Sequence, residues 1–67
     1  MTDPKPGSIW LREATGKMYA VEGECMLASS GEDGVLYRAI KGGPLIARAK
    51  AEFLDGRFTL MPPARTL

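Results

Sequence analysis

The chain has 67 residues, of which 45% are hydrophobic and 25% are charged, a composition that argues against disorder and for one small globular domain. Its formal net charge of +1 comes from nine basic and eight acidic side chains, which disfavours a dedicated nucleic-acid binder because phosphate binding needs a basic excess. A domain this small buries only about 60% of the surface of its unfolded chain, so we expect modest stability and leave association into a homodimer open.

Cysteine content and hydropathy predict the cellular compartment. The one cysteine, Cys25, cannot form an internal disulfide, and a small domain without disulfides suits a reducing cytoplasm. The first residues, "MTDPKPGSIW", lack the apolar core of a signal peptide, and no apolar run approaches the roughly 20 residues of a membrane span. The sequence therefore predicts a cytoplasmic protein that does not bind a membrane.

Two short strands are predicted in the first half of the chain. The runs at 8–13 and 18–27 are apolar and rich in β-formers, and the turn "ATGK" joins them, with Gly16 able to take a positive φ. Gly23 interrupts the second run and predicts a bulge or bend there. The polar segment "ASSGEDG" at 28–34 is expected to be a loop.

Three further strands and one helical turn are predicted in the second half. The runs "VLYRAI" at 35–40 and "LIARAK" at 45–50 are typical of strands joined by the break "KGGP". The segment "AEFL" at 51–54 is too short for an independent helix and fits a single helical turn. The dipeptide "DG" then turns the chain into a last strand at 57–61, which ends at two prolines.

Five short strands with tight turns predict a mainly β fold. We expect a small five-stranded, strongly bent antiparallel sheet or an SH3-like barrel, with one helical turn before the last strand. The domain is expected to span residues 8–61, between a flexible N-terminal tail at 1–7 and a frayed C-terminal tail at 62–67.

An α+β fold remains the alternative, because the stretch "IARAKAEFL" contains good helix formers. A helix over 46–54 would place Ile46, Ala49 and Phe53 on one face at helical spacing. The double glycine and proline before it would suit its start, and Gly56 would suit its end.

Four pieces of the chain form a recognisable pattern, namely Trp10, the hairpin "TGKMYAV", the strand "VLYRAI" and the run "PLIARAKAEFLDGRF". With these pieces, residues 7–60 resemble a family of short bacterial and phage-encoded domains of unknown function. The pieces are similar to an early aromatic strand followed by "V-V-Y-R-A-L" and "W-V-R-P-L-x-x-F". The chain departs from that pattern at Ile46, where the family has Trp, and at Ala49, where it has Pro. The resemblance implies a small SH3-like β domain and implies no activity.

The hairpin predicted around "KGGP", with Ile40 opposite Leu45, sorts its side chains into two faces by strand alternation. The face expected on the core side carries Leu36, Arg38, Ile40, Leu45, Ala47 and Ala49. The face expected on the outside carries Val35, Tyr37, Ala39, Ile46, Arg48 and Lys50. A one-residue bulge would exchange these assignments.

On the expected outer face, Tyr37, Arg48 and Lys50 form an aromatic patch rimmed with cations. Such a patch can stack an aromatic ligand and bind a carboxylate or a phosphate. The alternative is that the cations only solvate the sheet and pair with the acids that precede them in the chain.

The first hairpin predicts an aromatic cluster. We expect Glu13 to pair with Met18 in this hairpin. Strand alternation from this pair then places four side chains on one face, namely Trp10, Arg12, Tyr19 and Val21. A cluster around Trp10 is either a peptide-binding groove or the larger part of the core. Phe53 and Phe58 are expected in the core.

Catalytic and metal chemistry have little support in the sequence. There is no histidine, which removes the commonest general base and metal ligand near neutral pH, and one cysteine cannot build a thiolate metal site. The sequence therefore predicts a protein that is not an enzyme and that holds no cofactor or metal. An enzyme subunit that works only in an oligomer is the remaining alternative of this class.

The leading functional hypothesis is a non-enzymatic module that binds a protein or peptide partner. Aromatic side chains and arginine concentrate interface energy, so the candidate partner-binding residues are Trp10, Tyr19, Tyr37, Arg38, Arg48 and Lys50. The alternative is nucleic-acid binding through the basic segment at 34–51, which holds four cations and no acid.

Overall fold

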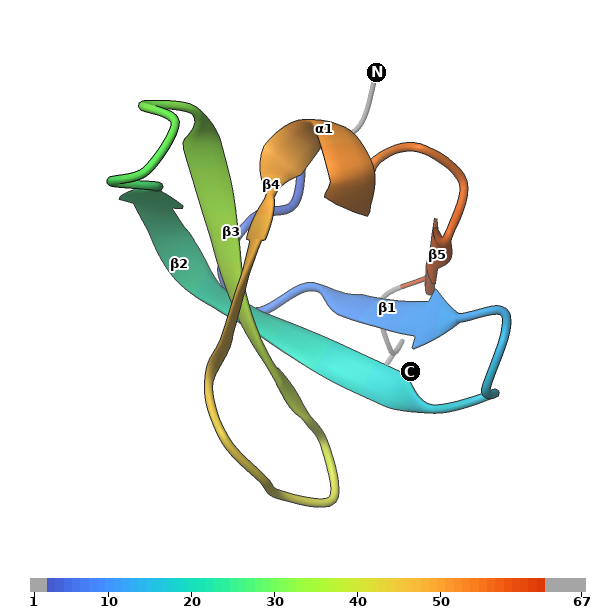
Figure 1. Ribbon diagram of the computed structural model, residues 1–67. Coiled ribbons are helices and arrows are strands. Elements are labelled where there is room, and N and C mark those ends of the chain that lie inside the picture. The colour runs from blue at the N-terminus through green and yellow to red at the C-terminus, as the bar shows by residue number, and fades with distance from the viewer. Residues whose placement is uncertain (1–2, 63–67) are drawn as a thin grey trace.

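Five antiparallel strands and one short helix form the fold of residues 3–62, the part of the chain that the computed structural model describes (Figure 1). In chain order the elements are β1 (Ile9–Arg12), β2 (Met18–Met26), β3 (Asp33–Ala39), β4 (Ile46–Ala49), α1 (Lys50–Phe53) and β5 (Phe58–Leu60). The predicted mainly β architecture, with one helical turn before the last strand, is confirmed. The alternative helix over 46–54 is wrong for its first half, because that half is strand β4.

The strands form one sheet in the order β4-β3-β2-β1-β5. The first four strands follow one another as a meander, and β5 returns to pair with β1 on its free side. The sheet is open rather than a closed barrel, because β4 and β5 lie at its two edges. Figure 1 shows the twist of the long strands β2 and β3, which carries β4 and α1 over the same side as β5.

The bulge predicted at Gly23 is confirmed. The β2–β3 pairing shifts register between Val21 and Gly23, so that one extra residue of β2 faces β3 at this point. A bulge increases the local twist and bends the strand, which lets β2 pair with β1 in its first half and with β3 along its whole length.

Both hairpins close two residues earlier than the sequence predicts. Leu11 rather than Glu13 pairs with Met18, and Ile46 rather than Arg48 pairs with Tyr37. The turns explain this shift, because in each hairpin the turn forms a backbone hydrogen bond to the end of the preceding strand. Gly16 N–H donates to the Arg12 carbonyl at 2.8 Å, and Gly42 N–H donates to the Ala39 carbonyl at 2.9 Å. A shift by two residues preserves which side chains share a face.

The buried face of β3 and β4 is opposite to the predicted one. Val35 and Tyr37, expected outside, are 0% and 1% exposed, whereas Ile40 and Leu45, expected in the core, are 54% and 45% exposed. Of the face predicted to be buried, only Ala49 is buried. The face that was predicted to be buried carries the guanidinium of Arg38 at its centre, and burial of this charge without a partner would be costly. The opposite face, which carries Tyr37, packs against aromatic rings from distant elements.

The core is a cluster of aromatic rings with two valines. Phe53 of α1 stacks on Phe58 of β5, with ring centroids 4.4 Å apart, and Trp10 meets Phe53 edge-on at 5.0 Å. Tyr37 lies edge-on to both phenylalanine rings, and Tyr19 to Tyr37 and Phe58. The predictions that Phe53 and Phe58 are core residues and that Trp10 and Tyr19 share a face are confirmed. The four-residue helix has no side-chain cap, so the burial of Phe53 is what holds it in place.

The residues before β1 contact the domain from residue 3 onward. Pro4 is fully buried, Gly7 N–H donates to the Val21 carbonyl at 2.9 Å, and the Asp3 carboxylate lies 3.3 Å from the Lys50 ammonium. The segment predicted as a flexible tail over 1–7 is therefore attached to the sheet where the structure describes it. The C-terminal tail predicted at 62–67 lies outside the described residues except for Pro62.

Candidate functional site

The aromatic residues of the predicted binding surface are core residues in the structure. Trp10, Tyr19 and Tyr37 are 4%, 8% and 1% exposed, and each packs against other rings of the aromatic cluster. Side chains this buried offer a partner almost no contact area. The three aromatic residues that were predicted to bind a partner therefore lie close together, but in the core rather than on the surface.

Arg38 lies on the outer face of the sheet and connects two segments. Its Nε donates to Glu22 Oε2 at 2.7 Å, and its Nη1 donates to the Gly43 carbonyl at 2.9 Å. The first contact is a cross-strand ion pair with β2, and the second holds the β3–β4 loop (residues 40–45) against β3. Arg38 therefore positions a loop rather than presenting a free cation.

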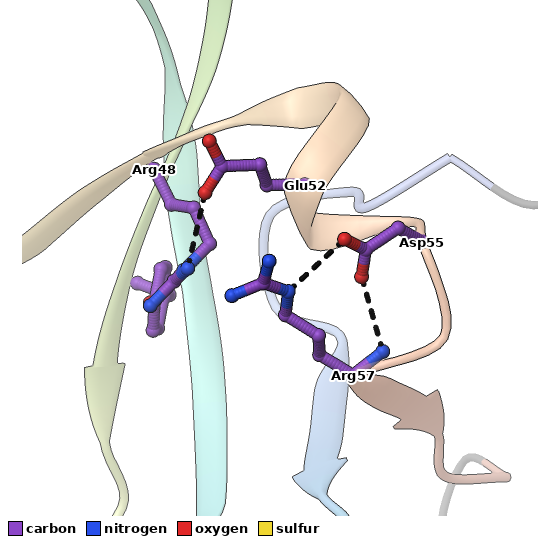
Figure 2. Close-up of polar contacts among 5 residues, drawn as sticks. Arg48, Glu52, Asp55 and Arg57 are labelled. Atoms are coloured by element: carbon purple, nitrogen blue, oxygen red, sulfur yellow. Dashed lines mark hydrogen bonds and ion pairs between the residues drawn. The ribbon is translucent and has the colours of Figure 1, made fainter.

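Arg48 and Lys50 are also paired with acids. Arg48 donates from Nε to the Tyr37 hydroxyl at 2.9 Å. It also donates from Nη1 to Glu52 Oε1 at 3.3 Å (Figure 2). The hydrogen bond to Tyr37 raises the pKa of the Arg48 guanidinium above its ordinary value, so this group stays charged. The Lys50 ammonium lies 3.3 Å from Asp3 and 3.9 Å from Glu24.

These contacts disperse the basic segment at 34–51. Three of its four cations, all except Lys41, bind acidic side chains from β2, α1 or the N-terminal segment. Figure 2 shows the same pattern just beyond this segment, where Arg57 Nε donates to Asp55 Oδ2 at 3.0 Å beside the Arg48–Glu52 pair. The local charge excess seen in the sequence is thus neutralised by the fold.

A groove of about 560 Å³ lies between the β1–β2 turn (residues 13–17) and the β3–β4 loop. It is lined by residues 15–18 and 39–42, and both segments leave the same end of the sheet, to the right and at the bottom of Figure 1. The sequence predicts both turns as connectors but does not predict that they meet. We refer to this feature as the turn groove.

Backbone hydrogen bonds build the turn groove. In the β1–β2 turn the Arg12 carbonyl accepts from Gly16 N–H, and Gly16 has a φ of 74°, which favours glycine. In the β3–β4 loop Gly42, with a φ of 103°, donates to the Ala39 carbonyl. Ile40 N–H donates to the Met18 carbonyl at 3.0 Å and ties the two walls together. These hydrogen bonds fix both walls of the groove.

The turn groove is lined by two large apolar side chains and by two lysines. Met18 is 47% exposed and Ile40 is 54% exposed, although both are large apolar residues. Lys17 and Lys41 line the same groove, and within residues 3–62 neither of them makes an ion pair. No acidic side chain is among the described residues that line it. These four residues were missed at the sequence level, where the only signal was an apolar residue next to a lysine at each strand end.

Comparisons with protein-family models, curated proteins and solved structures find no match to this chain. The resemblance drawn from "VLYRAI" and "PLIARAKAEFLDGRF" therefore stays a prediction. Among residues 3–62, no helix has the length and apolar character needed to cross a membrane. In the same residues no three His, Cys, Asp or Glu side chains gather in a way that would hold a metal ion.

Proposed function

We propose that this protein is a non-enzymatic cytoplasmic binding module that recognises a segment of a protein partner by accepting an apolar side chain into the turn groove. One observation carries the proposal. Met18 and Ile40 are joined by a backbone hydrogen bond and expose about half of their surfaces in a groove that two tethered turns keep open. Exposed apolar surface gathered in a concave site is typical of a protein-binding surface.

Burial of these two side chains would supply the binding energy. Complete burial of a large aliphatic side chain contributes about 1.5–3 kcal/mol, and about half of this remains available for each residue because each is already half buried. Because the walls are fixed by backbone hydrogen bonds, little conformational entropy is lost on binding. A short peptide segment is the partner whose size matches this groove.

The proposal keeps a protein or peptide partner but moves the contact away from the aromatic cluster. Trp10, Tyr19 and Tyr37 stabilise the scaffold, and Arg38 holds one wall of the groove through Gly43. The reducing compartment is supported by Cys25, which has no second cysteine to pair with. The absence of histidine in the sequence supports a role in binding rather than in acid–base catalysis.

Nucleic-acid binding through residues 34–51 has less support. Its affinity would depend on free cations that neutralise phosphates, and three of the four cations in this segment already bind carboxylates. A gel-shift titration with single-stranded and double-stranded oligonucleotides at low salt separates the two functions. A shift that Arg48→Glu abolishes would favour the nucleic-acid alternative.

Selection from a phage-displayed library of random peptides tests the proposal directly. The full chain is expected to enrich peptides that share a large apolar residue, and Ile40→Asp is expected to abolish this enrichment. Met26→Asp is the matched control, because Met26 is 71% exposed at the other end of β2 and does not line the groove. Equal enrichment by the wild-type chain and by Ile40→Asp would contradict the proposal.

A further inference from the structure

We propose that the partner segment is acidic, with a carboxylate next to its apolar anchor that binds between Lys17 and Lys41 at the mouth of the turn groove. This inference rests on the proposed function and specifies its ligand. It follows from the positions of the two lysines, from the distribution of the other charges and from the exposure of the groove.

The two lysines both line the turn groove, each one residue beyond the positions that a backbone hydrogen bond joins. Tyr19 pairs with Ala39, and the next position outward joins Met18 and Ile40 through a backbone hydrogen bond. One further step outward along both chains reaches Lys17 on one wall and Lys41 on the other, and both line the groove. An anion held in this groove would be attracted by both ammonium groups.

The remaining charges leave these lysines without a partner inside the described part of the chain. Arg38, Arg48, Lys50 and Arg57 each bind an acidic side chain. The nearest acid in sequence, Glu13, accepts a hydrogen bond from the Thr59 hydroxyl on β5 instead. Four of the eight cations in residues 3–62 thus form ion pairs, and two of the other four, Lys17 and Lys41, line the turn groove.

The resulting surface is complementary to a particular ligand chemistry. An apolar floor formed by Met18 and Ile40 with a cationic rim fits an apolar side chain flanked by aspartate or glutamate. Because the lysines lie at an exposed rim, they are expected to control specificity, association rate and salt dependence more than total affinity. A peptide with lysine in place of the acid would be repelled.

The composition of the peptides enriched from the random library tests this inference. The wild-type chain is expected to enrich aspartate or glutamate beside the apolar anchor. The double variant Lys17→Glu, Lys41→Glu is expected to lose that preference and to enrich lysine or arginine there. Lys5→Glu is the matched control, because Lys5 is exposed and lies outside the groove. The double variant Lys17→Gln, Lys41→Gln, which introduces no new charge, is expected to keep the anchor preference and to lose the acid preference.

A synthetic peptide from the wild-type selection then gives the magnitude. Its Kd is expected to rise on the order of tenfold in Lys17→Glu, Lys41→Glu and to rise with salt in the wild-type chain. Backbone amide NMR spectra of both double variants show whether the fold is retained.

Three outcomes would overturn the inference in distinguishable ways. Enrichment of the apolar anchor without acids would overturn the inference and leave the proposed function standing. Absence of any enrichment, or enrichment that Ile40→Asp does not affect, would overturn both. Binding of oligonucleotides that depends on Lys17 and Lys41, with no peptide enriched, would replace the acidic peptide by a nucleic acid.

Discussion

Arg48 Nε donates a hydrogen bond to the hydroxyl of Tyr37 at 2.9 Å, although the two residues are not opposite each other in the sheet. Val35 faces Arg48, and Tyr37 faces Ile46, so Arg48 reaches diagonally across two residues of β3. This contact closes the edge of the aromatic core and satisfies the one polar atom of the Tyr37 side chain. It is the link between the buried cluster and the charged surface around α1.

Replacement of Tyr37 by Phe should lower the free energy of unfolding by about 0.5–1.5 kcal/mol, the usual net value of one hydrogen bond. The ring contacts with Tyr19, Phe53 and Phe58 are kept, so the fold should be retained. Chemical denaturation monitored by circular dichroism measures the change. The stability difference from wild type should be constant from about pH 6 to about pH 9, because a raised pKa of Arg48 means that its charge is lost only at still higher pH. A difference that varies with pH in that window would contradict this assignment.

Truncation of Phe53 should be the most damaging single change in the second half of the chain. Phe53 is fully buried and stacked on Phe58, so Phe53→Ala should cost about 3–5 kcal/mol, comparable to the whole stability expected of a domain this small. Phe53→Leu should leave a folded protein of reduced stability. Met26→Ala, at a residue that is 71% exposed, is the control and should change the unfolding midpoint little. A cooperative unfolding transition for Phe53→Ala near that of wild type would show that α1 does not depend on this contact.

Gly34 is required by a close approach of two side chains, one at the end of β2 and one just after it. A Cβ at this position would lie 2.7 Å from Cys25 Sγ and 3.0 Å from Leu27 Cδ2, so Gly34→Ala should destabilise the fold by about 1–3 kcal/mol. Cys25→Ala removes the nearest atom, and the cost of Gly34→Ala should be smaller in that background. Gly23→Ala is the control, because a Cβ there meets nothing within 4 Å. Additive effects of Gly34→Ala and Cys25→Ala in a double-mutant cycle would refute this contact.

Arg38 should control the shape of the turn groove more than the stability of the sheet. Arg38→Met removes the hydrogen bond to the Gly43 carbonyl and the ion pair with Glu22, both partly exposed, so the unfolding free energy should fall by no more than about 1 kcal/mol. Amide hydrogen exchange at residues 42 and 43 should become faster, and peptides selected on the wild-type chain should bind more weakly. Arg57→Met is the matched control, since its ion pair with Asp55 has similar exposure and lies outside the groove. Unchanged exchange in Arg38→Met would rule out the positioning role.

The proposed binding surface is harder to predict from the sequence than the fold, and the reason lies in β3 and β4. In the predicted strand at 35–40 the two candidate faces carry Val35, Tyr37 and Ala39 or Leu36, Arg38 and Ile40, and neither face is uniformly polar. Alternation sorts residues into faces but does not say which face is buried. The arginine in the second set was the available signal, since an unpaired buried guanidinium is costly. The structure buries the face that was predicted to be outside, so that Tyr37 lies in the core and Ile40 is exposed in the turn groove.

The amino-acid sequence by itself determined the order and type of the elements, the bulge at Gly23 and the helical turn before the last strand, which was predicted at 51–54 and lies at Lys50–Phe53, because these depend on local propensity and on glycine at the turns. Only the tertiary structure decided which face is buried, which acids pair with the basic segment, and that Lys17, Lys41, Met18 and Ile40 line one groove. Those outcomes depend on contacts between residues far apart in the chain, which hairpin closure and aromatic packing select together and which no local pattern encodes.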